Sequence, residues 1–205
     1  MKEYQLTKFD QIFLGIIYGF IFPILFFLIF WWVSIPLVPE KQIFIFAFSG
    51  LGLGIIIDLV FLKFLIKNSY RIKGIYLILV YIFYSIGYFG FFMGVPIFNL
   101  FLGIPAGIFI ARKSVILNLS TKESNQEIER ISKITSGIML VICLISATIA
   151  LNDIYTVSGL KGMLGLMFPI SQELLVGLII VGGIVLIIGQ YFVTKYSYLL
   201  VRKIF

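Results

Sequence analysis

The carboxyl group with the strongest potential for chemistry belongs to Asp58, which lies inside the apolar segment 43–66. An ionised carboxylate within hydrocarbon is costly unless it is paired or hydrated, and burial favours its protonated form. We therefore interpret Asp58 as a candidate proton- or cation-coupling site, or a gate residue. The alternative is a structural carboxyl that a nearby Lys or Arg neutralises, or that is hydrogen-bonded to another helix.

Three further polar side chains are expected at a similar depth, in the third of the membrane nearest the cytoplasm. Tyr76 and Tyr81 lie early in the third apolar segment, and Gln190 lies late in the last one. If their helices are adjacent, these residues are the expected partners of Asp58. Gln190 also suits a simpler role, because buried amides often hold membrane helices together.

A second polar group is expected towards the outside, within roughly 10 Å of the outer boundary by helical rise. Its members are neutral amide and hydroxyl residues, some beside aromatic rings: Ser49, Tyr88, Asn99 and Thr148. Such groups suit a small uncharged or zwitterionic ligand. The alternative is that each side chain is satisfied within its own helix.

Several chemistries are excluded by what the chain lacks. It has no His and a single Cys, Cys143, which excludes internal disulfides and any histidine-based acid–base pair or metal site. Asp58 is the only carboxylate well inside an apolar segment, so a paired aspartyl site is excluded too. No nucleotide-binding glycine loop or Ser/His/Asp set is present. We predict no catalytic residue, metal or cofactor, and rank a lipid-modifying enzyme as the weakest alternative.

The elements that position these residues are long apolar segments. Hydrophobic residues make up 61% of the chain, with a mean hydropathy of +1.13. A helix of about 20 apolar residues crosses ~30 Å of hydrocarbon. We predict an all-α membrane bundle, one integral membrane domain over residues 1–205, with six transmembrane helices near 11–33, 43–66, 74–93, 96–111, 134–151 and 173–194.

The charge distribution predicts the orientation. Of the 16 Lys and Arg residues, all except Lys41 and Lys161 fall in one alternating set of gaps between the apolar segments or, for Lys63, in the last turn before such a gap. Basic residues collect on the cytoplasmic side, so both termini are predicted to be inside a multi-pass protein of the cell membrane. The net charge of +7 is explained by anionic lipid headgroups, so the lipid bilayer is the expected partner and nucleic acid is not.

Proline and glycine interrupt several of the predicted helices. Pro23 removes the hydrogen bond to the carbonyl of Gly19 and should kink the first helix, and Pro105 interrupts the fourth. Glycines at four-residue spacing permit close helix packing, at Gly15/Gly19, Gly50/Gly54 and Gly103/Gly107. Broken helices at membrane depth often line a substrate path in transporters.

Two polar segments carry local signals. Between the fourth and fifth helices, Ser124 and Glu127 have the spacing of a capping box, and Glu129–Lys133 is a favourable pair on a helical extension. On the outer side, residues 158–171 are mostly apolar but too few to span the membrane. We predict a helix that lies in the interface or re-enters it, with Gly159, Gly162 and Gly165 leaving one face bare against the bundle.

Together these features favour a small transport protein, or the membrane subunit of a transporter, that handles a small solute. Its expected partners are other membrane subunits or a separate ATPase subunit, because the chain has no nucleotide site of its own. The alternative is a non-catalytic scaffold or assembly subunit of a larger membrane complex. A polar cavity reaching Asn99 or Asp58 would favour transport, and a solid bundle with an exposed glycine face would favour the scaffold.

Overall fold

The computed structural model describes residues 5–153, 155–157, 159 and 171–204. These residues form helices and connecting turns, and no strand occurs among them. Six helical stretches are long and apolar enough to cross a membrane. The predicted all-α architecture is confirmed, and the chain is a multi-pass membrane protein. The predicted outer helix with its three glycines lies mostly at residues 160–170, outside the described residues.

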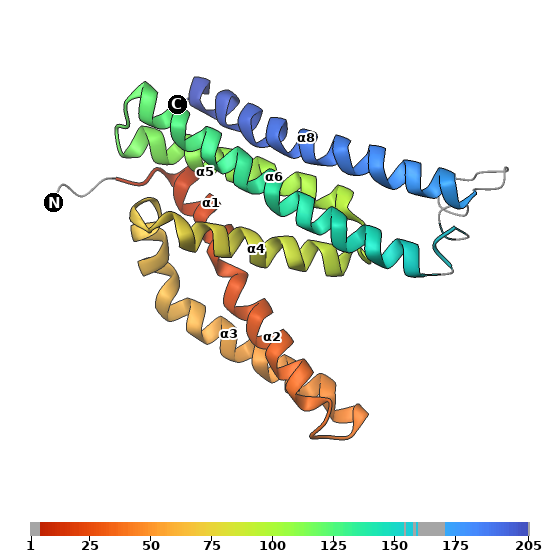
Figure 1. Ribbon diagram of the computed structural model, residues 1–205. Coiled ribbons are helices and arrows are strands. Elements are labelled where there is room, and N and C mark those ends of the chain that lie inside the picture. The colour runs from red at the N-terminus through yellow and green to blue at the C-terminus, as the bar shows by residue number, and fades with distance from the viewer. Residues whose placement is uncertain (1–4, 154, 158, 160–170, 205) are drawn as a thin grey trace. The chain divides into compact units, whose positions relative to one another are not determined.

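The chain divides into two compact units, residues 1–77 and 78–205, which we call the N-terminal and C-terminal units. The N-terminal unit contains α1 (Lys8–Gly19), α2 (Ile21–Ser34), α3 (Glu40–Asn68) and the short 3-10 helix η1 (Ser69–Arg71). Its largest packing surface joins α2 to α3, which lie side by side (Figure 1). The start of α4 (Gly74–Phe91) completes this unit.

The first membrane-spanning stretch is broken at Phe20. Helix α1 ends at Gly19 and α2 begins at Ile21, with Phe20 in a turn between them. Pro23 has no N–H and cannot donate to the carbonyl of Gly19 four residues earlier. The kink expected from Pro23 is therefore present as an interruption of the helix.

Helix α3 approaches α2 closely because two of its buried residues are glycines. A Cβ added to Gly50 would lie 2.5 Å from the carbonyl oxygen of Phe26, and one on Gly54 would lie 2.5 Å from that of Phe22. Both gaps are far below van der Waals contact, so only glycine permits this packing. This glycine pair joins two helices of the same unit, as its spacing predicts.

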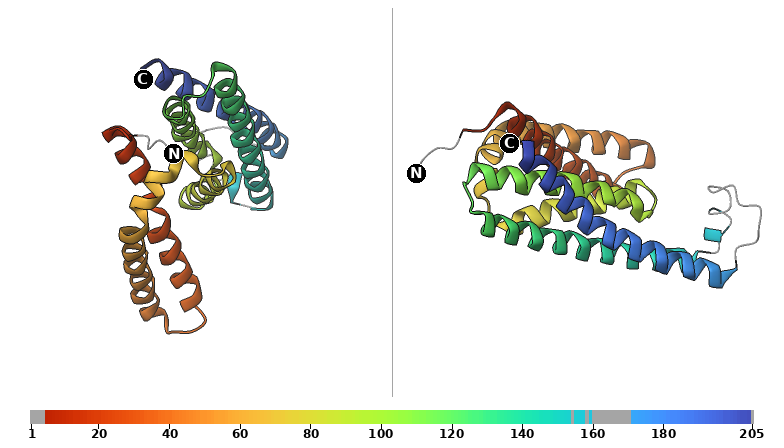
Figure 2. Two further views of the ribbon diagram at one scale, coloured as in Figure 1. Left: turned by 90° about the vertical axis from the view of Figure 1, so that its left-hand side faces the viewer. Right: turned by 90° about the horizontal axis from the view of Figure 1, so that it is seen from above.

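The C-terminal unit is built from the remainder of α4, η2 (Pro96–Leu102), α5 (Gly103–Ile116), α6 (Thr121–Asn152) and α8 (Gln172–Ile204). Helix α8 packs along both α5 and α6, and the views in Figures 1 and 2 agree on this arrangement. The polar stretch before the fifth predicted span continues directly into α6, as expected.

The fourth span differs from its predicted form. Residues Pro96–Leu102 form a 3-10 helix, and the α-helix begins only at Gly103. Pro105 does not interrupt α5, because it lies in the first turn, where backbone N–H groups have no helical acceptor. The turn before this span lies near Gly94, as predicted, with a φ of 80°.

The capping box of α6 lies four residues earlier than predicted. The Ser120 hydroxyl accepts from the backbone N–H of Glu123, and the Glu123 carboxylate accepts from the N–H of Ser120. The prediction from Ser124 and Glu127 was wrong because both residues have partners on other helices. Ser124 is hydrogen-bonded to Ser114 and Tyr198, and Glu127 is paired with Lys113.

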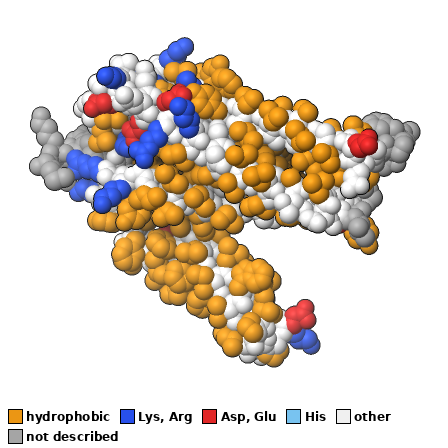
Figure 3. Space-filling model, in the orientation of Figure 1, with side chains coloured by type: hydrophobic (Ala, Val, Ile, Leu, Met, Phe, Trp, Pro, Cys, Tyr) orange, Lys and Arg blue, Asp and Glu red, His pale blue; other side chains and the backbone are white. Residues whose placement is uncertain are grey.

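The surface of the C-terminal unit has the distribution expected of a membrane protein. Hydrophobic side chains cover the sides of its helices, and Lys and Arg gather where α5 ends and α6 begins (Figure 3). This is the end that the charge pattern places in the cytoplasm.

Candidate functional site: a polar column in the C-terminal unit

Four polar residues form one stripe along α8. Gln190, Thr194, Tyr198 and Arg202 recur every four positions, so they lie on one helix face over ~18 Å of rise. The first three are completely buried, with 0% of their surface exposed. A polar stripe with this burial faces the interior of the unit rather than lipid.

Two glycines of α5 make room for this stripe. A Cβ on Gly103 would lie 2.8 Å from Nε2 of Gln190, and one on Gly107 would lie 2.3 Å from the carbonyl oxygen of Thr194. Any larger residue would displace α8 or its polar side chains. The glycine spacing noted in the sequence therefore positions the polar stripe as well as the helices.

The outermost layer of the column joins Asn99 to α4. The Asn99 side chain is 1% exposed, and its Nδ2 donates to the carbonyl oxygen of Ser85 at 2.8 Å. Its Oδ1 is buried and has no hydrogen-bond partner among the described residues. Asn99 thus presents an unused acceptor inside the unit.

The next layer lies one helical turn further along α4. The amide of Gln190 donates from Nε2 to the hydroxyl of Tyr81 at 2.8 Å, and its Oε1 has no partner in the described chain. Tyr81 is four residues before Ser85, and Gly103, over which the Gln190 amide lies, is four residues after Asn99. Asn99 and Gln190 therefore occupy successive layers, and each has an amide nitrogen that donates and an amide oxygen without a partner among the described residues.

The third layer consists of hydroxyl groups. The Thr194 hydroxyl donates to the carbonyl oxygen of Gln190 at 2.9 Å and lies 3.2 Å from the hydroxyl of Thr135 on α6. Thr135 in turn lies 3.1 Å from the carbonyl oxygen of Ser132. The Ser132 hydroxyl is fully buried and has no partner among the described residues.

The last layer lies at the basic end of the unit. Ser124 of α6 is hydrogen-bonded to Tyr198 of α8, and its hydroxyl donates to that of Ser114 on α5 at 2.8 Å. Arg202 donates from Nη1 to the Tyr198 hydroxyl at 2.7 Å. We call these four layers the polar column: Ser85–Asn99, Tyr81–Gln190, Thr135–Thr194 and Ser124–Tyr198.

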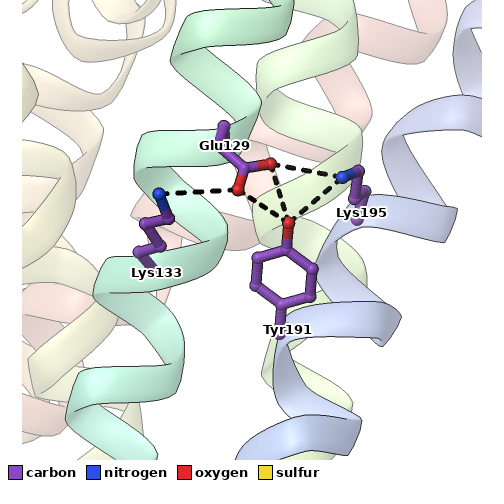
Figure 4. A network of polar contacts seen from close by, with 4 residues as sticks. All are labelled: Glu129, Lys133, Tyr191 and Lys195. Atoms are coloured by element: carbon purple, nitrogen blue, oxygen red, sulfur yellow. Dashed lines mark hydrogen bonds and ion pairs between the residues drawn. The ribbon is translucent and has the colours of Figure 1, made fainter.

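A charged hydrogen-bond network links α6 to α8 beside the column. The Tyr191 hydroxyl lies 2.7 and 2.8 Å from the two carboxylate oxygens of Glu129, and Lys195 donates to the same carboxylate at 3.2 Å (Figure 4). The predicted pair of Glu129 with Lys133 is confirmed, at 3.6 Å. These side chains are partly exposed, so the network holds the helices in register without belonging to the buried column.

The residues of the outer polar group expected from the sequence lie on different elements and have different surroundings. The hydroxyls of Ser49 and Thr148 are exposed and each donates at 2.9 Å to a carbonyl of its own helix, four residues earlier. Tyr88 lies against the ring of Phe92, 5.9 Å between centroids. Asn99 is the one member of that group that joins the polar column.

Asp58 lies in the N-terminal unit and is 94% buried, with 6% of its surface exposed. No hydrogen bond or ion pair of its carboxyl occurs within the described residues, and Oδ1 is buried without a partner. Of its three expected partners, Tyr76 is 57% exposed, and Gln190 is bonded to Tyr81 in the C-terminal unit.

The sequence pointed to Gln190, Tyr81 and Asn99, but it did not single out the hydroxyl residues that complete the column. The missed signal is the four-residue spacing of Thr194 and Tyr198 after Gln190. On α6 a matching signal exists, because buried Ser124, Ser132 and Thr135 share a helix face.

A second feature at the basic end is an open depression on α6, with a volume of about 670 Å³ and lined by Thr121, Lys122, Asn125, Gln126 and Glu129. Its lining comes from one stretch of a single helix, so it lacks the convergent groups of a binding site. Comparison with known proteins adds no assignment: no family model, curated protein or solved structure matches this chain.

Proposed function

We propose that the protein is a small membrane transport protein, and that its C-terminal unit conducts a small uncharged solute along the polar column. The unused hydrogen-bonding groups inside that unit carry the proposal. Asn99, Gln190 and Ser132 each keep a buried polar atom without a partner in the described chain. Leaving such an atom unpaired costs ~1–3 kcal/mol, so a bound solute or water stabilises the column.

The chemistry of the column indicates the class of solute. Its layers offer amide oxygens and hydroxyl groups, with Arg202 only at the basic end. Groups of this kind recognise hydrogen-bonding molecules without a net charge, whereas an ion would require a compensating charge within the membrane. Urea, small polyols and water itself fit this description.

The glycine pairs weigh against the alternative, a membrane scaffold. That hypothesis relied on small-residue faces free to pack against partner proteins. Gly50 and Gly54 are instead closed against α2, and Gly103 and Gly107 against α8. The faces that motivated the scaffold are therefore used within the chain.

A flux assay tests the proposal. The purified chain, reconstituted in liposomes, is challenged with urea or glycerol gradients, and vesicle volume is followed by stopped-flow light scattering. We expect solute entry above that of empty liposomes, without ATP or an ATPase subunit. Gln190→Leu and Asn99→Leu should abolish it, because each removes an unused amide from the column.

Thr148→Val is the matched control, because its hydroxyl is exposed and bonded within its own helix. It should leave the flux unchanged. Flux no greater than that of empty liposomes for urea, glycerol and water would contradict the proposal. If the protein then purifies only with a second membrane protein, the scaffold alternative is favoured.

A further inference from the structure

Asp58 terminates the small-residue stripe with which α3 faces the preceding helices. The buried residues of α3 are Ala47, Gly50, Gly54 and Asp58, which share one helix face. Gly54, one turn before Asp58, would place a Cβ 2.6 Å from the Cα of Pro23. The Asp58 carboxyl therefore lies at the level where α1 ends and α2 begins.

The break between these helices lies directly beside the carboxyl. Oδ2 of Asp58 is 4.0 Å from the position that a Cβ on Gly19 would occupy. Because Pro23 has no backbone N–H, the carbonyl of Gly19 receives no hydrogen bond from the residue four positions later. A buried carboxyl and a backbone acceptor released from its helix thus occur at the same point in the unit.

The other titratable groups on the packed elements do not neutralise this carboxyl. On α1, Asp10 accepts from Thr7 and from Tyr70 of η1, and the Tyr18 hydroxyl is bonded to Ser69. On α3 itself, Lys63 is exposed, and the sequence of α2 contains no charged residue. Asp58 therefore faces the break without an ion pair to any described residue of this unit.

From this geometry we propose that Asp58 and the released backbone carbonyl of Gly19 form a site for one monovalent cation, a proton or Na⁺. A proton would make Asp58 a neutral donor to a released carbonyl oxygen. Na⁺ would be held by the carboxylate and carbonyl oxygens, the arrangement by which broken membrane helices bind ions. Either ligand cancels the charge of the buried carboxylate. The site belongs to the N-terminal unit and is independent of the solute path proposed above.

Thermal unfolding of the full chain in detergent tests the proposal. Melting is measured from about pH 5 to about pH 9, a range above the ordinary titration of Asp, in NaCl and in N-methylglucamine chloride. A ligand that binds only the folded state raises the melting temperature. If Na⁺ is the ligand, NaCl should raise it by several degrees at high pH. If the proton is the ligand, the melting temperature should fall as pH rises in both salts, because the unpaired carboxylate then ionises.

Two variants localise the effect. Asp58→Asn should abolish the dependence on Na⁺ and on pH, whereas Asp153→Asn, at the exposed end of α6, should retain it. Pro23→Ala restores a donor for the Gly19 carbonyl and should weaken the dependence while keeping the carboxyl. If Asp58→Asn fails to fold, the melting of Pro23→Ala still tests whether the released carbonyl takes part in the site.

Either ligand pattern in the wild type, lost in Asp58→Asn or weakened in Pro23→Ala, supports the site. Melting of the wild type that is independent of both Na⁺ and pH would overturn it. An unchanged dependence in Pro23→Ala would overturn the role of the broken helix. Solute flux is not measured in this experiment, so its outcome does not depend on the transport proposal.

Discussion

Gly107→Ala is the substitution whose effect follows most directly from the packing of α5 against α8. The added Cβ would lie 2.3 Å from the carbonyl oxygen of Thr194 and 2.8 Å from both the Cβ of Ser197 and the backbone nitrogen of Tyr198. Two of these neighbours are backbone atoms, which no rotamer change can move away. The helices must separate, and the polar column between them must open.

The size of the effect is set by two opposing terms. Ordinary contact begins at 3.4 Å, so the methyl group is about 1.1 Å too close to Thr194. Overpacking of this kind costs ~1–3 kcal/mol, and contact with backbone favours the upper part of that range. Replacing glycine by alanine within a helix returns about 0.5–1 kcal/mol. We expect a net loss of about 1–2 kcal/mol in the free energy of unfolding.

The assay is equilibrium unfolding in mixed detergent micelles, followed by tyrosine and tryptophan fluorescence. Gly137→Ala on α6 is the matched control, because a Cβ there would meet no atom within 4 Å. It should be neutral or stabilising. If Gly107→Ala is as stable as Gly137→Ala, the close approach of α5 and α8 is wrong, and so is the polar column built on it.

Three further predictions concern the rest of the chain. Cysteines replacing Lys41 and Lys122 should react with impermeant reagents from opposite sides of the membrane, and labelling from one side would refute the six-span topology. Ser120→Ala should destabilise α6 by ~1 kcal/mol through loss of its cap, measured by chemical unfolding, whereas no loss would place the helix start elsewhere. Glu129→Gln should lower stability less than Ser120→Ala in the same assay because the network is partly exposed, and an equal or larger loss would contradict this exposure.

The helices themselves were predictable because membrane crossing depends on length and hydrophobicity, which a sequence displays directly. The break near Pro23 was predictable for a similar reason, since a missing N–H acts locally. The 3-10 form of Pro96–Leu102 was not, because it depends on where α5 begins. That start turned Pro105 from an expected interruption into a first-turn residue.

The start of α6 shows how a local signal can be ambiguous. The sequence contains two overlapping pairs with capping-box spacing, Ser120 with Glu123 and Ser124 with Glu127. Spacing alone does not choose between them. Ser120 rather than Ser124 caps the helix because the Ser124 hydroxyl is hydrogen-bonded to Tyr198 on α8.

The candidate site was predictable only residue by residue. Gln190 and Asn99 stand out as amides in apolar segments, but which helices are adjacent is not encoded in composition. Gln190 was therefore one of three candidate partners for Asp58, and the structure adds that its amide donates to Tyr81 within the C-terminal unit. The hydroxyl residues were missed because Ser and Thr are common in membrane helices and satisfy their own backbone.

Cysteine accessibility along α8 tests whether the polar column forms a solute path. In a background lacking Cys143, single cysteines replace Gln190 and Thr194 on the buried face, and Ile188 and Phe192, which are 52% and 46% exposed on the apolar face. Thiol reaction requires the thiolate, which forms in water and not in lipid.

If the column forms the path, iodoacetamide, a small uncharged thiol reagent, should label Gln190→Cys and Thr194→Cys at least about tenfold faster than Ile188→Cys and Phe192→Cys, because only the column admits water. Melting temperatures close to that of the parent confirm that each variant is folded. Equal or slower labelling of the two column positions would show that the column is not a solute path.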